Sequence, residues 1–106
     1  MFTKELHRKL SGTGITTYAI HPGVIATNLM SFSKSYMAGF HLVGKSPKQG
    51  AQTTIHCAVA EGIERDSGLY FSDCAIQESS QESYDEGVAK KLWDLSEQMT
   101  NVKFPL

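Results

Sequence analysis

The segment His21-Pro22-Gly23-Val24-Ile25-Ala26-Thr27-Asn28 contains the residues of this chain best suited to bind a ligand. Proline and glycine turn the backbone away from the apolar segment before them, which leaves N–H and C=O groups near Val24 and Ile25 without strand partners. One free donor and one free acceptor at fixed geometry can hold a ligand that carries an amide. Thr27 adds a hydroxyl two residues further on. The alternative is an ordinary turn that ends a strand, and the spacing alone does not decide between the two.

The other chemistry-bearing residues form no recognisable site. The four histidines lack metal-ligand spacing, and His21 is expected to be a partly buried packing residue rather than a base. The two cysteines, Cys57 and Cys74, are too few for a disulfide framework or a zinc site. We expect both to be reduced thiols in an intracellular protein, with Cys57 in the core and Cys74 more exposed. Trp93 is likewise expected in the core rather than at a binding site.

Two helices and a strand should position the loop at Pro22. Phe2, Leu6 and Leu10 share one helical face over residues 1–11, and the glycines of Ser11–Gly14 end that helix. Ile15–His21 is β-branched and aromatic without alternation, which is typical of a parallel strand covered on both faces.

A second helix is predicted over Ser46–Ala60. Ser46 is its N-cap, Pro47 its first residue and Gln49 the third residue of a capping box. Gly62 is the expected stop of this helix. A narrow buried face is predicted for its small and apolar residues, which are Ala51, Ile55, Ala58 and Val59.

The last part of the chain predicts a strand, a loop and a helix. Leu69–Ser72 reads as a second short buried strand, and residues 75–82 as a polar loop. Ser83 and Glu86 suggest a capping box before the last helix, whose apolar stripe is Val88, Leu92, Leu95 and Met99. The fold class is therefore α/β, with two parallel strands and three main helices. Two parallel strands are rarely stable alone, so we expect further strands from elsewhere.

Composition excludes several functions. The 106 residues have a net charge of −1, and the ten Lys and Arg residues form no cluster dense enough for nucleic acid. No apolar run approaches the roughly 18 residues that a membrane span needs, so none is expected in this chain.

Four segments together resemble a known family: LSGTGITTYAIHPGVIATNL, SPKQGAQTTIHCAVAEG, SGLYFSDC and AKKLWDLSE. In this order and spacing they resemble the C-terminal part of short-chain dehydrogenases/reductases, most closely the retinol dehydrogenase-like group, from about Phe2 to Ser96. The resemblance implies the C-terminal part of a single Rossmann-type domain, with a doubly wound parallel sheet, over residues 1–106. It also implies a mobile substrate lid over residues 28–45. The residues it assigns to the nicotinamide carboxamide of the cofactor are Pro22, Gly23, Val24, Ile25 and Thr27.

The resemblance further implies hydride transfer between NADP(H), or NAD(H), and a small lipophilic alcohol or carbonyl such as retinol or retinal. By analogy such an enzyme is intracellular, either cytoplasmic or associated with the endoplasmic reticulum, and a homo-oligomer is a possible assembly. The sequence does not settle the substrate, its stereochemistry or the choice between NADP and NAD.

Two family motifs are missing from the chain. It contains neither the glycine-rich turn TGxxxGxG, which binds the pyrophosphate, nor the catalytic pair Tyr-x-x-x-Lys. No residue present is therefore assigned a catalytic role, and whether the chain is itself an enzyme stays open. We expect a C-terminal fragment that is inactive alone. The alternative is a truncated, non-catalytic isoform that acts as a protein-binding module.

Overall fold

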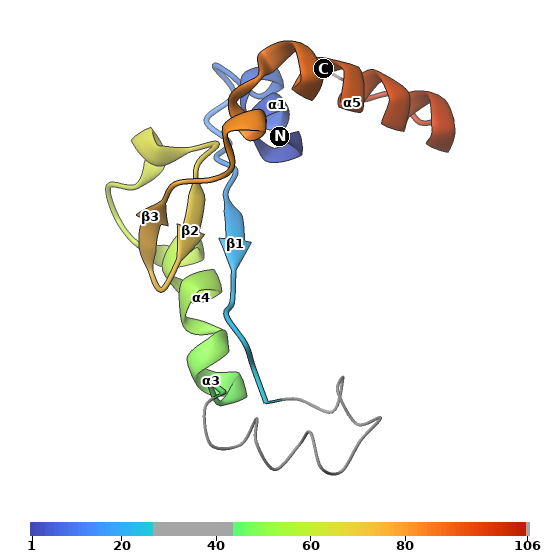
Figure 1. The fold of residues 1–106 in the computed structure, drawn as a ribbon. Helices are drawn as coiled ribbons and strands as arrows, with labels where there is room; N and C mark the ends of the chain where they lie inside the picture. Colours follow the sequence, from blue (N-terminus) through green and yellow to red (C-terminus); the bar gives the residue numbers. More distant parts are fainter. Residues whose placement is uncertain (27–43, 106) are drawn as a thin grey trace, which may run out of the picture.

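The computed structural model describes residues 1–26 and 44–105, and these form an α/β structure. A small sheet lies between two groups of helices, with α1 and α5 at one end and α3 and α4 at the other (Figure 1). The helices are α1 (Phe2–Lys9), α3 (Pro47–Gly50), α4 (Gln52–Val59) and α5 (Glu86–Thr100), with 3₁₀ turns η2 (Glu64–Asp66) and η3 (Gln81–Tyr84). The strands are β1 (Ala19–His21), β2 (Tyr70–Ser72) and β3 (Ala75–Gln77).

The sheet is mixed, with the order β1-β2-β3. β1 and β2 are parallel, as predicted, with Ile20 opposite Phe71. The prediction of a polar loop over 75–82 is wrong at its start, because β3 pairs antiparallel with β2. Asp73 and Cys74 join the two strands with φ angles of 52° and 59°, the left-handed conformation that a two-residue hairpin turn requires. Neither residue is glycine, so the usual hairpin signal was missing from the sequence.

The first strand is shorter and more exposed than predicted. Only three of the residues 15–21 form β1, and none of the three is fully buried. The expectation of a strand covered on both faces is therefore wrong for the described residues. Among these elements β1 contacts chiefly β2 and α4, so its other side has little to cover it.

The helix predicted over Ser46–Ala60 forms, divided at Ala51 into α3 and α4. Its capping box is confirmed: Gln49 N–H donates to Ser46 Oγ at 3.3 Å, and Ser46 N–H to Gln49 Oε1 at 2.8 Å. Ala51 keeps right-handed helical angles of −73° and −15°, so α3 and α4 run on almost as one helix (Figure 1). The helix ends at Val59, three residues before Gly62. Its predicted buried face is wrong, because Ile55 is 49% and Val59 72% exposed.

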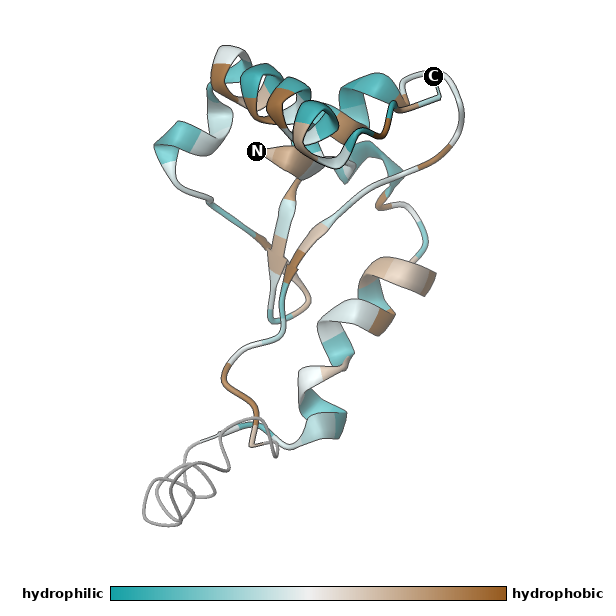
Figure 2. Cartoon of the chain, turned by 90° about the vertical axis from the view of Figure 1, so that its right-hand side faces the viewer, coloured by the Kyte–Doolittle hydropathy of each residue, from teal (hydrophilic) through white to brown (hydrophobic). Residues whose placement is uncertain are grey.

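The last helix begins at a different cap and buries a different face from those predicted. Asp85, not Ser83, is the N-cap, and its Oδ1 accepts from Val88 N–H at 2.9 Å. The helix buries Ala89 and Trp93 against α1, as expected for Trp93. The residues of the predicted stripe are instead exposed, namely Val88, Leu92, Leu95 and Met99. Figure 2 shows that hydrophobic positions recur along this helix.

Among the described residues, the buried apolar core is small and lies in two places. Phe71, in the central strand, is 2% exposed and meets the Tyr18 ring edge-on at 5.4 Å between centroids. Leu10, Ala89 and Trp93 form the second part, between α1 and α5. Within the described residues no helix is long and apolar enough to span a membrane.

Candidate functional site

The loop singled out from the sequence begins where β1 ends. Pro22 follows the last residue of β1, and the structure describes the loop as far as Ala26. Ligands of open α/β sheets bind at the carboxyl ends of parallel strands, and this loop lies at that end of the β1–β2 pair. Thr27 lies outside the described residues, as does most of the predicted lid over 28–45, of which only Gly44 and Lys45 are described.

A bridge to Lys45 fixes the backbone of the loop. Ile25 and Lys45 form an isolated parallel β-bridge. Lys45 N–H donates to the Val24 carbonyl at 2.9 Å, and Ala26 N–H donates to the Lys45 carbonyl at 3.0 Å. The carbonyl of Val24 is therefore paired, contrary to the expectation that the groups near it are free.

Within residues 1–26 and 44–105, the N–H and C=O of Ile25 have no partner. In a parallel bridge the two neighbours of a residue bond to the partner, so its own N–H and C=O point to the opposite side. Among the described residues, no backbone partner is recorded for these two groups of Ile25. They present one donor and one acceptor, side by side, on the face of the loop away from Lys45.

The side chain of Ile25 packs against the backbone of Gly50. A Cβ at Gly50 of α3 would lie 2.1 Å from Ile25 Cδ1, so the isoleucine occupies the space that only glycine leaves open. Gly50 is buried and Ile25 is half-buried. Because α3 is fixed by its capping box, this contact sets the position of the loop relative to the helix.

An ion pair links the same loop to the β2–β3 turn. Lys45 Nζ pairs with Asp73 Oδ1, and the hydrogen bond and charge of the lysine lower the pKa of the Asp73 carboxyl below its usual range, with a smaller contribution from His21. Gly23, at φ +84°, passes close to the same lysine, since a Cβ there would lie 3.0 Å from Nζ. Lys45 therefore connects Gly23, the bridge at Ile25 and the turn at Asp73.

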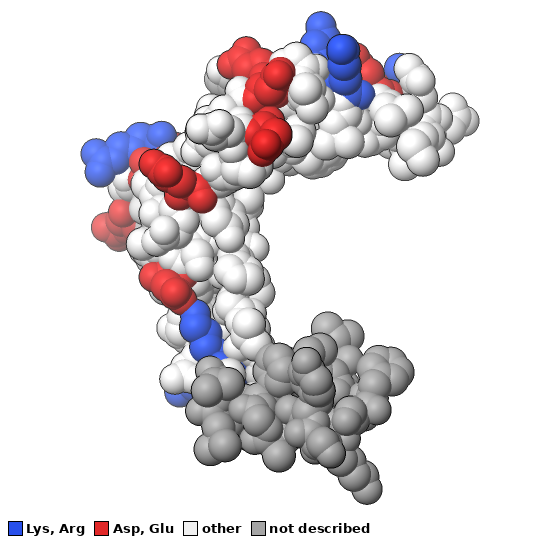
Figure 3. Space-filling model, in the orientation of Figure 1, with Lys and Arg blue, Asp and Glu red and all other residues white. Residues whose placement is uncertain are grey.

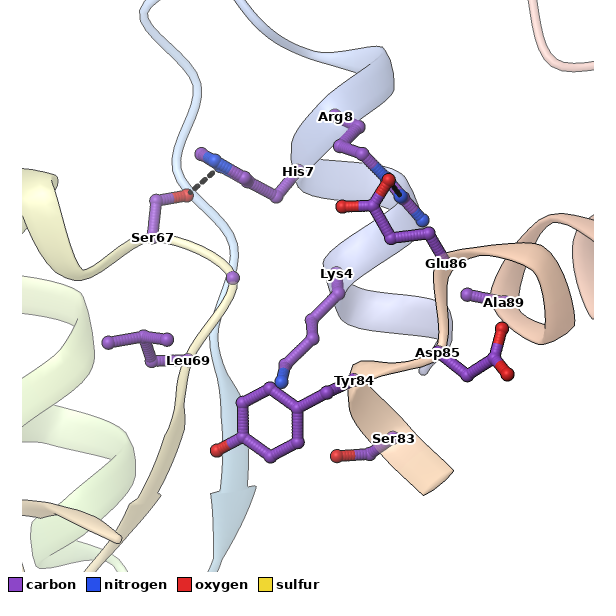
Figure 4. A pocket seen from close by; sticks show the side chains of 11 residues that line it. Lys4, His7, Arg8, Ser67, Leu69, Ser83, Tyr84, Asp85, Glu86 and Ala89 are labelled. Carbon is purple, nitrogen blue, oxygen red and sulfur yellow. Dashed lines mark hydrogen bonds and ion pairs between the residues drawn. The ribbon is translucent and has the colours of Figure 1, made fainter. Parts of the chain in front are cut away.

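A cavity of about 270 Å³ lies at the other end of the sheet, where β2 begins (Figure 4). Lys4, His7 and Arg8 of α1 face Ser67 and Tyr84 across it. His7 Nδ1 lies 2.8 Å from Ser67 Oγ, and Lys4 Nζ lies 3.0 Å from the centroid of the Tyr84 ring.

The basic side chains of Lys4 and Arg8 beside this cavity already have interaction partners within the protein. Arg8 pairs with Glu86 at 2.9 Å and with Glu5. The pKa of Tyr84 is lowered, chiefly by a side-chain hydrogen bond with Ser79. Sequence reasoning did not single out these residues. Their polar groups join α1 to the segment before β2 and to the start of α5, which is a structural role. The cavity lies away from Pro22–Ala26.

The remaining sequence candidates are one histidine and two cysteines. His21 is exposed, contrary to the expectation of a partly buried packing residue. Cys57 is half-buried, so the expectation that it lies in the core is wrong, whereas Cys74 is exposed as expected. Both cysteines are free. Across residues 1–26 and 44–105, no group of three potential metal ligands is found.

The fold, the loop and the relatives together define the class of protein. No family model matches the chain, but individual curated proteins match nearly all of it. The chain belongs to the short-chain dehydrogenase/reductase family, in its retinol dehydrogenase-like group. The α/β structure, with its parallel strand pair, is compatible with part of a Rossmann-type domain.

Three relatives show the extent of the similarity. Retinol dehydrogenase 11 of Homo sapiens is 44% identical over 99 residues, covering 91% of this chain and 31% of that protein. Retinol dehydrogenase 14 of Mus musculus is 41% identical over 109 residues, covering 96% of this chain and 33% of that protein. Dehydrogenase/reductase SDR family member 13 of Bos taurus is 35% identical, covering 96% of this chain and 29% of that protein. The chain thus spans about a third of the length of these relatives.

Proposed function

We propose that the loop at the end of β1 binds the nicotinamide carboxamide of NADP(H), with NAD(H) as the alternative cofactor. The observation that carries this proposal is the pair of backbone groups at Ile25. A carboxamide has one acceptor oxygen and one donor NH₂, which match the N–H and C=O of Ile25. Pro22 and Gly23 turn the chain to this position, and Val24 is paired to Lys45. Thr27, assigned by the resemblance, would add a hydroxyl.

The whole protein is then an oxidoreductase that interconverts a lipophilic alcohol and a carbonyl. The names of the relatives support this reading, since retinol dehydrogenases are among them. A nicotinamide bound at this loop would supply or accept the hydride, and residues Pro22–Ala26 would orient its ring. The printed sequence lacks TGxxxGxG and Tyr-x-x-x-Lys. We therefore expect no turnover from these 106 residues alone, because pyrophosphate binding and proton transfer need groups that they do not contain. The two free cysteines suit the reducing environment of an intracellular enzyme, cytoplasmic or at the endoplasmic reticulum.

A chimaera tests the proposed function. The aligned 99 residues of retinol dehydrogenase 11 of Homo sapiens would be replaced by this chain, and NADPH-dependent reduction of retinal would be measured. We expect the chimaera to reduce retinal, and Thr27→Val, which removes only the hydroxyl, to lower kcat/KM by about tenfold, the cost of one hydrogen bond. A folded chimaera that fails to bind NADPH would refute the proposal.

A second function, a non-catalytic binding module, is favoured by one observation. The stripe on α5 leaves Leu95 52% and Met99 79% exposed, and exposed apolar surface of this kind commonly marks an interaction site. The two functions differ in what Leu95→Glu does. If the chain is a binding module, Leu95→Glu should abolish a complex between this chain and full-length retinol dehydrogenase 11 of Homo sapiens, measured by sedimentation. Self-association of the chain, measured in the same experiment, tests the homo-oligomer.

A further inference from the structure

Cys74 contacts a threonine of α4, the helix that also carries Cys57. Cys74 lies in the turn between β2 and β3, and its N–H donates to Thr53 Oγ1 at 3.2 Å. The Sγ of Cys74 lies 4.0 Å from the same oxygen. Thr53 is buried on α4, with 3% of its surface exposed. The turn is therefore held against the helix with the Cys74 thiol beside Thr53.

Cys57 lies one helical turn after Thr53 on α4. It follows Thr53 by four residues on α4, so the two share one face of the helix. Helical Cα–Cβ bonds tilt toward the N-terminus, which directs Cys57 toward Thr53 and hence toward Cys74. Burial raises the pKa of the Cys57 thiol, and the nearby Cys74 raises it further, as expected for two sulfurs within electrostatic range of each other.

We propose that Cys57 and Cys74 form an intramolecular disulfide when the chain meets a hydroperoxide. The exposed Cys74 thiolate attacks a peroxide oxygen, which gives a sulfenic acid and, from hydrogen peroxide, water. The Cys57 thiolate then attacks the sulfur of that sulfenic acid and displaces hydroxide, which takes up the proton lost by Cys57 and becomes the second water. Two thiols and one peroxide thus give one disulfide and two waters, with both cysteine sulfurs oxidised and the peroxide reduced. The first step also removes the thiolate charge of Cys74, which favours ionisation of Cys57.

The disulfide would tie the β2–β3 turn to α4, one residue from Asp73. Asp73 forms an ion pair with Lys45, and Lys45 forms a β-bridge with Ile25. Oxidation would therefore restrict the motion of the turn that Lys45 links to the loop at Pro22. This inference concerns the thiols alone and does not depend on the proposed function.

Mass spectrometry of the oxidised chain tests the proposal. The chain has two cysteines, and trypsin separates them, because Gln49–Arg65 carries Cys57 and Asp66–Lys90 carries Cys74. With hydrogen peroxide we expect both thiols to be lost and the two peptides to be linked within a monomer. Linkage should form about tenfold or more faster in native buffer than in concentrated urea, because the fold raises the effective concentration of the two thiols.

Two serine variants provide the matched controls. Cys57→Ser should leave Cys74 as a sulfenic acid that a dimedone probe traps, and Cys74→Ser should leave Cys57 largely unoxidised. Linkage only between chains, or linkage equally fast in urea and in native buffer, would overturn the proposal, as would two thiols that survive peroxide treatment.

Discussion

The helices at the two ends of the sheet differ in how they bury their apolar residues. At one end, Trp93 of α5 is 4% exposed and stacks on Phe2 of α1, with 4.5 Å between ring centroids. Phe104 meets the same indole edge-on at 5.2 Å. At the other end, Ile55 and Val59 of α4 are 49% and 72% exposed. The α1–α5 end thus buries one apolar face against partner elements, although the stripe of α5 from Val88 to Met99 stays exposed, whereas α4 leaves both Ile55 and Val59 largely uncovered.

This difference shows what an apolar pattern does and does not specify. Both α4 and α5 carry apolar residues at helical spacing, yet only residues with a neighbouring element become buried. Figure 3 shows that the inner side of the curved molecule, along β1 and below α5, carries almost no charged side chains. Uncharged surface therefore continues beyond the core that α1 and α5 enclose.

The largest effect is expected from Trp93→Ala. Loss of a buried indole should lower the free energy of unfolding by about 3–5 kcal/mol. The matched variant, Val59→Ala, should change it by no more than about 0.5 kcal/mol, because the valine is mostly in water. Urea unfolding followed by circular dichroism measures both. Equal losses would mean that the two ends do not differ as described.

A smaller loss is expected from Gly50→Ala at the α3 end. The added Cβ would collide with Ile25, and overpacking of this kind costs about 1–3 kcal/mol. Ile25→Ala in the same chain removes the colliding atoms and should restore part of the loss, which a double-mutant cycle measures. If the two substitutions are additive, Gly50 and Ile25 do not share this space.

The smallest effect concerns the Lys45–Asp73 pair and is a dependence on pH. The pKa of Asp73 is lowered in the folded chain, so the pair stabilises the fold above the ordinary pKa of 3.8 and loses this contribution as pH falls through the lower, folded value. The effect is small because Asp73 is exposed. NMR titration of the Asp73 carboxyl should show a midpoint below 3.8 that Lys45→Met raises. An unchanged midpoint would show that the lysine does not act on this carboxyl.

Local features of the fold were predictable from the sequence. The capping box of Ser46 and Gln49 depends only on neighbouring residues, and the parallel strands at Ile20 and Phe71 have typical β-branched and aromatic surroundings. The family, and with it the position of the loop at Pro22, followed from four ordered segments.

Features that depend on tertiary contacts were not predictable. The hairpin of β2 and β3 turns through Asp73 and Cys74, which lack the glycine that usually marks such a turn. On α5 the periodicity allowed two adjacent faces, and packing of the bulky Trp93 on Phe2 selected the one that is buried. At the candidate site, the contact between Gly50 and Ile25 joins residues far apart in the sequence, so no local pattern could reveal it.

We propose that the backbone N–H and C=O of Ile25 bind a carboxamide. This binding is tested most directly by titrating the ¹⁵N-labelled chain with nicotinamide mononucleotide and following the Ile25 amide signal. We predict a saturable shift at Ile25 that is absent with nicotinic acid mononucleotide, whose carboxylate has no donor, and is weakened by Gly50→Ala. An Ile25 signal that stays in place, or that moves equally with both ligands, would contradict the account.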